Sequence, residues 1–202
     1  MQTSMVIRCG RFPCKDVRRE CFIVPGVRVA PQRISAVMIA EAAPAAPHDY
    51  FYAGGDSLFE RTTVQAFQDA GADVSTVRDV LNLGFYLTTA VKCGKTGYGV
   101  STATIQECAS LLDRELALFP RLKLVMLMGD VAIKAINYIA RQAGEGRVIP
   151  AVSTYKLRGE KFHFRGMRVF PSYLQAGPSF FIEKSKRKMI AQDIADALQL
   201  VA

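Results

Sequence analysis

The residues of this chain with the widest range of chemistry are its five cysteines, Cys9, Cys14, Cys21, Cys93 and Cys108. Thiolates ligate iron–sulfur clusters and structural zinc. An odd count leaves at least one thiol unpaired in any disulfide scheme, and disulfides are rare in reducing compartments. Ligation of a metal or a cluster therefore explains the cysteines better than disulfides do. The alternative is that most are small buried hydrophobic side chains, and their number alone favours that alternative.

Basic residues are the second feature with chemical consequences. Lys and Arg outnumber Asp and Glu by 26 to 18, which gives a formal charge of +8. A basic excess attracts polyanions and steers their approach, so DNA is a candidate partner. A protein with a basic surface and no nucleic-acid role shows the same excess. Two basic clusters supply the candidate phosphate contacts: Lys92, Lys95, Lys184, Lys186 and Arg187.

The length of 202 residues suits a single domain covering the whole chain, 1–202. Residues 1–33 are rich in Cys, Arg and Pro and too poor in apolar residues for a core of their own, so we expect an extension packed on the domain. No apolar run is long enough to span a membrane, and the start of the chain has no signal-peptide core. The expectation is therefore a cytoplasmic protein, monomeric and without a membrane partner.

Short apolar or β-branched runs predict three buried strands: 36–40, 85–91 and 124–128. Apolar residues at helical spacing, with capping and stop signals, predict four helices: 57–70, 104–119, 131–142 (capped by Asp130) and 182–201. A hairpin around Gly166 is expected over 162–170.

Strands that alternate with helices predict an α/β fold with three layers, α/β/α, around a mostly parallel central sheet. Ligands of such sheets bind at the carboxyl ends of the strands. Four segments should meet at that edge: 41–55, 92–99, 129–130 and 170–177.

The order of several motifs resembles that of the family-4 iron–sulfur uracil-DNA glycosylases, within the uracil-DNA glycosylase superfamily. Val37-Met-Ile-Ala-Glu-Ala42 is similar to their first active-site motif, and Tyr86-Leu-Thr-Thr-Ala-Val-Lys-Cys93 to their second strand. Segments 124–132, 154–159 and 169–174 resemble the motifs that follow. The resemblance extends from about Cys9 to Leu198 and implies a uracil-DNA-glycosylase-like fold.

The resemblance also implies roles for individual residues. Glu41 stands at the position of the catalytic carboxylate, which would stabilise an oxocarbenium-like sugar or activate water. Tyr52, with Phe51 beside it, would stack on the extruded base, and Ser172 would also contact the base.

Two departures from the family pattern concern base recognition. Thr89 replaces an Asn that reads uracil, and a single hydroxyl cannot supply the donor and acceptor of a planar amide. The histidine of the last motif is missing, since its position holds Phe170 or Leu174 according to the alignment. Loss of one such donor typically costs about 10²–10³ in rate.

The resemblance further implies a structural 4Fe–4S cluster on Cys9, Cys14, Cys93 and Cys108, with zinc as the alternative metal. The first pair is spaced more widely than is usual in the family, and Cys21 is a rival ligand. One cysteine would remain a free thiol.

Three functional hypotheses follow. The first is a DNA glycosylase that excises uracil or a related damaged base in base excision repair. The second is a catalytically inactive iron–sulfur relative that binds DNA. The third is an α/β enzyme for a small nucleotide-like substrate. The carboxylate at Glu41 and the cysteines favour the first, whereas Thr89 and the missing histidine favour the second or a different base.

Overall fold

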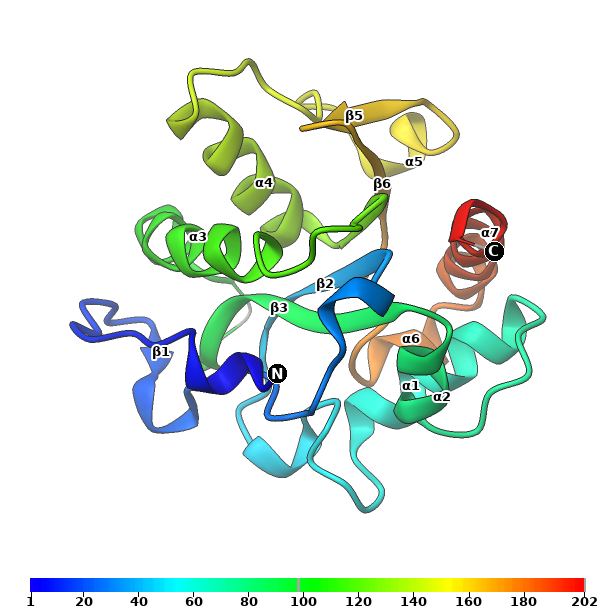
Figure 1. The fold of residues 1–202 in the computed structure, drawn as a ribbon, viewed down its shortest axis with the longest axis horizontal. Coiled ribbons are helices and arrows are strands. Elements are labelled where there is room, and N and C mark those ends of the chain that lie inside the picture. The colour runs from blue at the N-terminus through cyan, green and yellow to red at the C-terminus, as the bar shows by residue number, and fades with distance from the viewer. Residues whose placement is uncertain (98, 202) are drawn as a thin grey trace.

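The computed structural model describes residues 1–97 and 99–201 and centres on one six-stranded sheet (Figure 1). Its strands are β1 (Val17–Arg18), β2 (Ala36–Ala43), β3 (Phe85–Lys95), β4 (Leu124–Met128), β5 (Phe162–Phe164) and β6 (Met167–Ser172). They lie in the order β1-β3-β2-β4-β6-β5. The four inner strands are parallel, and the short strands at the two edges are antiparallel to their neighbours.

Helices cover both faces of this sheet. They are α1 (Leu58–Asp69), α2 (Val77–Asn82), α3 (Thr102–Leu116), α4 (Asp130–Gln142), α5 (Thr154–Leu157), α6 (Ser179–Ile182) and α7 (Lys184–Val201). One core forms where α3 and α4 pack on the sheet, and a second where α1, α2 and α7 pack on the opposite face (Figure 1). The expected three-layer α/β/α architecture is therefore confirmed.

The three inner strands predicted from apolar runs are present because both of their faces are covered, as in other parallel sheets. Ala36 on β2 pairs with Phe85 on β3 and with Leu124 on β4, so the three strands start level. Both β2 and β3 continue beyond the predicted ends, to Ala43 and Lys95. Glu41 and Lys92 consequently belong to strands and not to loops.

The structure confirms most of the helix starts and turns predicted from the sequence. Ser57 caps α1 by accepting a hydrogen bond from the Glu60 backbone N–H, and a hairpin joins β5 to β6. Asp130 does not cap α4, because the capping position is Gly129 and Asp130 is the first helical residue. The last predicted helix, 182–201, is present as α7, which begins at Lys184 and follows the short helix α6. In the described parts of the chain, no helix combines the length and apolar character needed to cross a bilayer.

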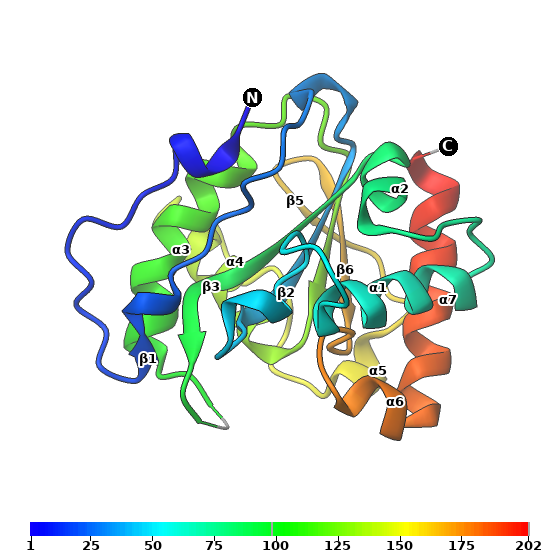
Figure 2. The ribbon, with the colours of Figure 1, turned by 90° about the horizontal axis from the view of Figure 1, so that it is seen from below.

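The N-terminal segment, residues 1–33, packs along α3 and the outer edge of β3 (Figure 2). It holds three single turns of 3-10 helix, η1 (Thr3–Met5), η2 (Arg19–Cys21) and η3 (Pro31–Arg33), and a fourth, η4 (Pro47–Asp49), follows β2. Ile7 and Val24 of the segment bury their side chains against Leu111 of α3. The Thr3 hydroxyl is buried and donates to the Pro25 carbonyl at 3.0 Å.

Substitution of Gly94 on β3 offers a test of how tightly the N-terminal segment packs on this strand. A Cβ at Gly94 would lie 2.7 Å from the Cys21 Cβ and 2.9 Å from the Pro44 carbonyl oxygen. We expect Gly94→Ala to lower the free energy of unfolding by about 1–3 kcal/mol, because backbone and a packed side chain must move. Urea denaturation measures the change. The control is Gly146→Ala, whose Cβ would meet nothing within 4 Å; equal stability of the two variants would contradict the prediction.

Candidate active site and cysteine cavity

Glu41 lies near the carboxyl end of β2, where its side chain crosses the turn between β4 and α4. An added Cβ at Gly129 would be only 2.7 Å from Glu41 Oε1 and 2.8 Å from its Cγ. Gly129 also has a φ of 103°, which a residue with a side chain rarely adopts. A glycine is therefore required here for the carboxylate to reach the start of α4, where Oε1 lies 3.5 Å from the Val131 backbone N–H.

Two sources of positive potential surround this carboxylate. One is the N-terminal end of α4, where unpaired backbone N–H groups favour negative charge. The other is Lys95, whose Nζ lies 3.8 Å from Glu41 Oε2. The Glu41 side chain is 19% exposed, so it is sheltered and still reachable by water. Such a group can orient a water molecule or stabilise developing positive charge on a sugar.

The aromatic residues predicted to stack on a base follow η4. Phe51 is fully buried and packs edge-on against Tyr50, with ring centroids 5.2 Å apart. The Tyr52 hydroxyl accepts a hydrogen bond from the Leu87 backbone N–H at 2.9 Å, on the free edge of β3. Burial raises the pKa of Tyr52. In this arrangement the Tyr52 hydroxyl pairs with a backbone N–H of β3, which differs from the predicted stacking role.

The two polar residues predicted to contact the base are both buried. Thr89 is fully buried, and its hydroxyl has no hydrogen-bond partner. The Ser172 hydroxyl, in contrast, donates to Asp193 of α7, which Arg158 also holds through two nitrogens. Burial raises the pKa of Asp193, and the hydrogen bonds from Arg158 and Ser172 oppose that effect. The Ser172 hydroxyl is therefore occupied by a structural hydrogen bond, whereas the Thr89 hydroxyl makes none.

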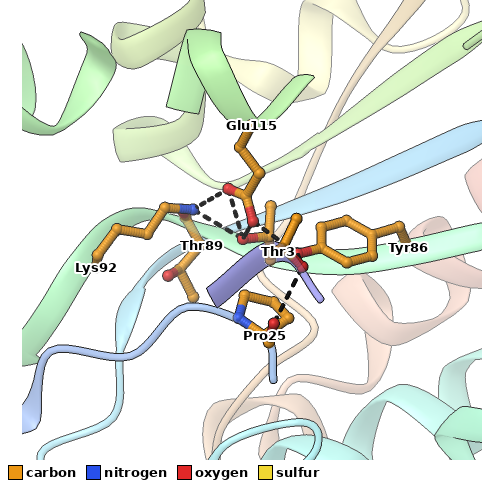
Figure 3. A network of polar contacts seen from close by, with 7 residues as sticks. Thr3, Pro25, Tyr86, Thr89, Lys92 and Glu115 are labelled. Carbon is orange, nitrogen blue, oxygen red and sulfur yellow. Dashed lines mark hydrogen bonds and ion pairs between the residues drawn. The ribbon is translucent and has the colours of Figure 1, made fainter. Parts of the chain in front are cut away.

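Lys92 does not lie where a DNA phosphate could reach it, which corrects the expectation from sequence. Its side chain is fully buried and forms an ion pair with Glu115 of α3, which is also fully buried (Figure 3). Its Nζ also donates to Thr88 Oγ1 at 2.8 Å and to the Thr89 carbonyl at 2.6 Å. The lysine pattern near residue 92 gave no sign that this cation points inward.

The ion pair extends into a network that reaches the N-terminal segment. The Tyr86 hydroxyl donates to Glu115 Oε1 at 2.7 Å and lies 2.8 Å from the Thr3 hydroxyl oxygen (Figure 3). Thr88 also donates to Glu115. Buried charges need such hydrogen bonds to offset the cost of leaving water.

The remaining predicted phosphate contacts lie near the start of α7. Arg187 pairs with Asp69 of α1, with Nη2 2.8 Å from Oδ1, and Lys186 pairs with Glu183. Lys184 is exposed. The structure thus brings none of these three next to Glu41 through a described contact, and only Lys95 among the predicted cations lies beside it.

The four cysteines matched to cluster ligands line one cavity of about 340 Å³ between the N-terminal segment, β3 and α3. Cys9 and Cys14 come from the segment, Cys93 from β3 and Cys108 from α3. Four arginines also line the cavity: Arg8, Arg11, Arg19 and Arg114. Residues far apart in sequence therefore converge on a single space.

The thiols are close enough to influence one another. Burial, followed by the neighbouring thiols, of which Cys108 has the largest effect, raises the pKa of Cys93 to about 12. No three His, Cys, Asp or Glu side chains in residues 1–97 and 99–201 are near enough to share a single metal ion. The rival ligand Cys21 does not line the cavity, and its thiol donates to the Ala45 carbonyl at 3.3 Å.

The family model of the uracil DNA glycosylase superfamily matches residues 29–196, which is most of the chain. The chain belongs to this superfamily. No curated protein matches it significantly. Membership in the uracil DNA glycosylase superfamily indicates DNA as the substrate and glycosylase activity as the general function.

Three residues of this uracil DNA glycosylase superfamily member were not singled out from sequence. Glu115 lies seven residues after Cys108, so it belongs to the buried stripe of α3, and an acid there signals a buried partner. Gln175 lies within the segment 170–177 expected at the site. Tyr50 directly precedes the two aromatic residues that were predicted to bind the base. Gln175 and Tyr50 are both buried.

The Lys92–Glu115 pair gives a direct test of stability. Lys92→Met or Glu115→Leu alone should lower the free energy of unfolding by about 3–5 kcal/mol, because each leaves a buried charge unpaired. The double variant should be more stable than either single variant, since no lone charge remains. Chemical denaturation of all four proteins measures these differences. Single variants of wild-type stability, or strictly additive losses, would contradict the pairing.

Proposed function

We propose that this chain is a DNA glycosylase that removes uracil or a related damaged base, with Glu41 as its catalytic carboxylate. The observation that carries the proposal is the position of Glu41 over Gly129, between the start of α4 and Lys95. Within a superfamily of DNA glycosylases, a sheltered carboxylate at the carboxyl edge of the sheet is suited to this reaction.

The reaction breaks the bond between the base and C1′ of the sugar and adds water. The base leaves with the bonding electron pair and takes a proton, and the water oxygen becomes bonded to C1′. Glu41 either accepts a proton from the attacking water or stabilises the positive sugar. The base must leave the stack to be reached, and unstacking costs least for mismatched, damaged or unpaired bases.

We further propose that the cysteine cavity holds a 4Fe–4S cluster, as in the family-4 enzymes that the sequence resembles. A single zinc would hold four thiolates about 2.3 Å from one point, whereas no three thiols of the described residues lie close enough to share one ion, and the four line a cavity of about 340 Å³. A buried cluster with four thiolates is anionic, and the four arginines of the lining supply compensating charge. Cys9, Cys14, Cys93 and Cys108 would be the ligands.

The cluster would have a structural role in this proposal. When bound it would supply cross-links between the N-terminal segment, β3 and α3. Neither Glu41 nor Lys95 lines the cavity, so neither would be a ligand. Metal content and base release are therefore measured as two separate properties.

The first prediction concerns catalysis. Glu41→Ala should lower the rate of base release from uracil-containing single-stranded oligonucleotides about 10²–10⁴-fold, the usual contribution of a positioned acid or base. Oligonucleotides that contain hypoxanthine or xanthine should be tested in parallel, because the base is part of the proposal. Glu145→Ala, at an exposed position in the loop after α4, is the matched control. A wild-type protein that binds DNA but releases no base would support the inactive-relative hypothesis instead.

The second prediction concerns the cluster. Anaerobically purified protein should contain about four irons per chain, with matching sulfide and a broad visible absorbance. Cys93→Ser and Cys108→Ser should each lose most of the iron, whereas Cys21→Ser should retain it because this thiol lies outside the cavity lining. Iron and sulfide analysis measures the outcome. One zinc per chain would favour the alternative metal, and protein free of both metals would contradict ligation.

A further inference from the structure

The end of β6 is held by a buried polar cluster that the proposed reaction does not use. Asp193 of α7 is 6% exposed and accepts hydrogen bonds from the Ser172 hydroxyl and from Arg158, whose Nε lies 3.0 Å from both carboxylate oxygens. Arg158 Nη2 also donates to the Met189 carbonyl at 2.8 Å. A buried carboxylate is tolerated only with such partners, so the cluster fixes the groups that belong to it.

The end of β6 needs this cluster because the strand is not fully covered there. A cavity of about 440 Å³ lies beside the last residues of β6 and has Phe170, Pro171 and Asp193 in its lining. Side-chain packing therefore does not enclose the strand on this side. The hydrogen bond from Ser172 to Asp193 joins β6 to α7 across this region.

The backbone of Ser172 connects the cluster to the turn beneath Glu41. Ser172 pairs with Met128, so β6 and β4 end level with each other. The Ser172 carbonyl accepts from the Gly129 N–H at 3.0 Å, and the Leu127 carbonyl shares this N–H at 3.2 Å. Gly129 is the residue over which Glu41 lies, since a Cβ there would be 2.7 Å from Oε1. Ser172 thus contacts the cluster with its side chain and the Gly129 turn with its backbone.

The Glu41 carboxylate depends on this turn because its other polar contacts are long. Its Oε1 lies 3.5 Å from the Val131 backbone nitrogen, and its Oε2 lies 3.8 Å from Lys95 Nζ. Contacts of this length are too weak to fix a side chain. The position of the carboxylate is therefore set by the close approach to Gly129 and follows any shift of that turn.

We propose that Asp193 is a positioning residue for Glu41. Asp193 holds the Ser172 hydroxyl, and the Ser172 carbonyl holds the turn over which the carboxylate lies. Arg158 orients Asp193 through both of its carboxylate oxygens. This role for Ser172 replaces the base contact that the resemblance implied. The inference rests on the proposed glycosylase function and adds the residues that position its carboxylate.

The experiment uses the full chain and single-stranded oligonucleotides that carry uracil, hypoxanthine or xanthine, whichever base the wild type releases. Ser172→Ala and Asp193→Asn should each lower the single-turnover rate of base release about 10- to 100-fold, because a shift of about 1 Å in a reacting group has a cost of this size. Affinity for an oligonucleotide with tetrahydrofuran in place of the nucleoside should stay within about twofold of the wild type, since only the chemical step is affected. Lost affinity with an unchanged rate would support a contact with DNA and overturn the positioning role.

Tyr86→Phe is the matched control for loss of a buried hydroxyl. The Tyr86 hydroxyl donates to Glu115 at 2.7 Å, and Tyr86 lies at the start of β3, at the opposite end of the sheet from Glu41. Its removal should lower the melting temperature and leave the rate of base release unchanged. Rates that fall in step with the melting temperature in all three variants would reduce the cluster to a structural role and overturn the inference.

A double-variant cycle tests whether the effect is exerted through Glu41. In a Glu41→Ala background, Ser172→Ala should cause no further loss of rate, because no carboxylate is left to misplace. Losses that multiply would show independent action and contradict the proposal. Ser172→Ala keeps the pair of Arg158 with Asp193, so this cycle remains available even if Asp193→Asn fails to fold.

Hydrogen exchange of the Gly129 amide, followed by NMR, gives a readout that does not depend on catalysis. Exchange should be faster in Ser172→Ala and Asp193→Asn than in the wild type and Tyr86→Phe, because the acceptor carbonyl is less firmly held. Unchanged exchange in both variants would overturn the inference and leave the proposed function standing. A wild type that releases no base, with faster exchange in the variants, would support the link to the turn and overturn the glycosylase.

Discussion

The buried ion pair between Lys92 and Glu115 is the interaction on which the other features of this structure depend. Both side chains are fully removed from water, so their charges are tolerated only with each other and with the surrounding hydroxyls. The groups that satisfy them belong to β3 and α3, and Tyr86 connects them to Thr3 of the N-terminal segment. Displacement of β3 or α3 would leave a charge without its partner.

This constraint matters because β3 carries residues of both candidate sites. Thr89 faces the core that contains Tyr50, and its carbonyl accepts from Lys92. Cys93, the residue after Lys92, lines the cysteine cavity. Lys95, at the end of the strand, lies beside Glu41. A fixed position for Lys92 therefore fixes the neighbouring Cys93 thiol and Thr89 together. Packing of the N-terminal segment on this strand links the cavity to the rest of the domain.

The distribution of charge also changes how the basic composition is interpreted. Several cations are engaged in ion pairs: Lys92 with Glu115 and Arg158 with Asp193 in the interior, and Arg187 with Asp69 at the surface. Others lie around the cysteine cavity, where they suit an anionic group. Each ion pair removes one positive and one negative charge, so the net charge of +8 is unchanged, but the paired cations are not free to contact phosphates. Lys95 has a more specific place, since its ammonium group faces the proposed catalytic carboxylate.

The sequence by itself determined the layered α/β fold, the inner strands and the edge of the sheet at which Glu41 lies. Apolar runs and helical spacing report local burial, and burial on both faces of a strand leaves the same pattern in any parallel sheet. The sequence also singled out the four cysteines of the cavity, through the order of its motifs.

Only the tertiary structure decided where the polar side chains point. Lys92 and Lys95 look alike in sequence, but one is buried with Glu115 and the other lies beside Glu41, because strand alternation and the packing of α3 orient them differently. For the same reason the unpartnered oxygen of Gln175 could not be foreseen, since an unpartnered buried atom is a property of packing and has no local signature.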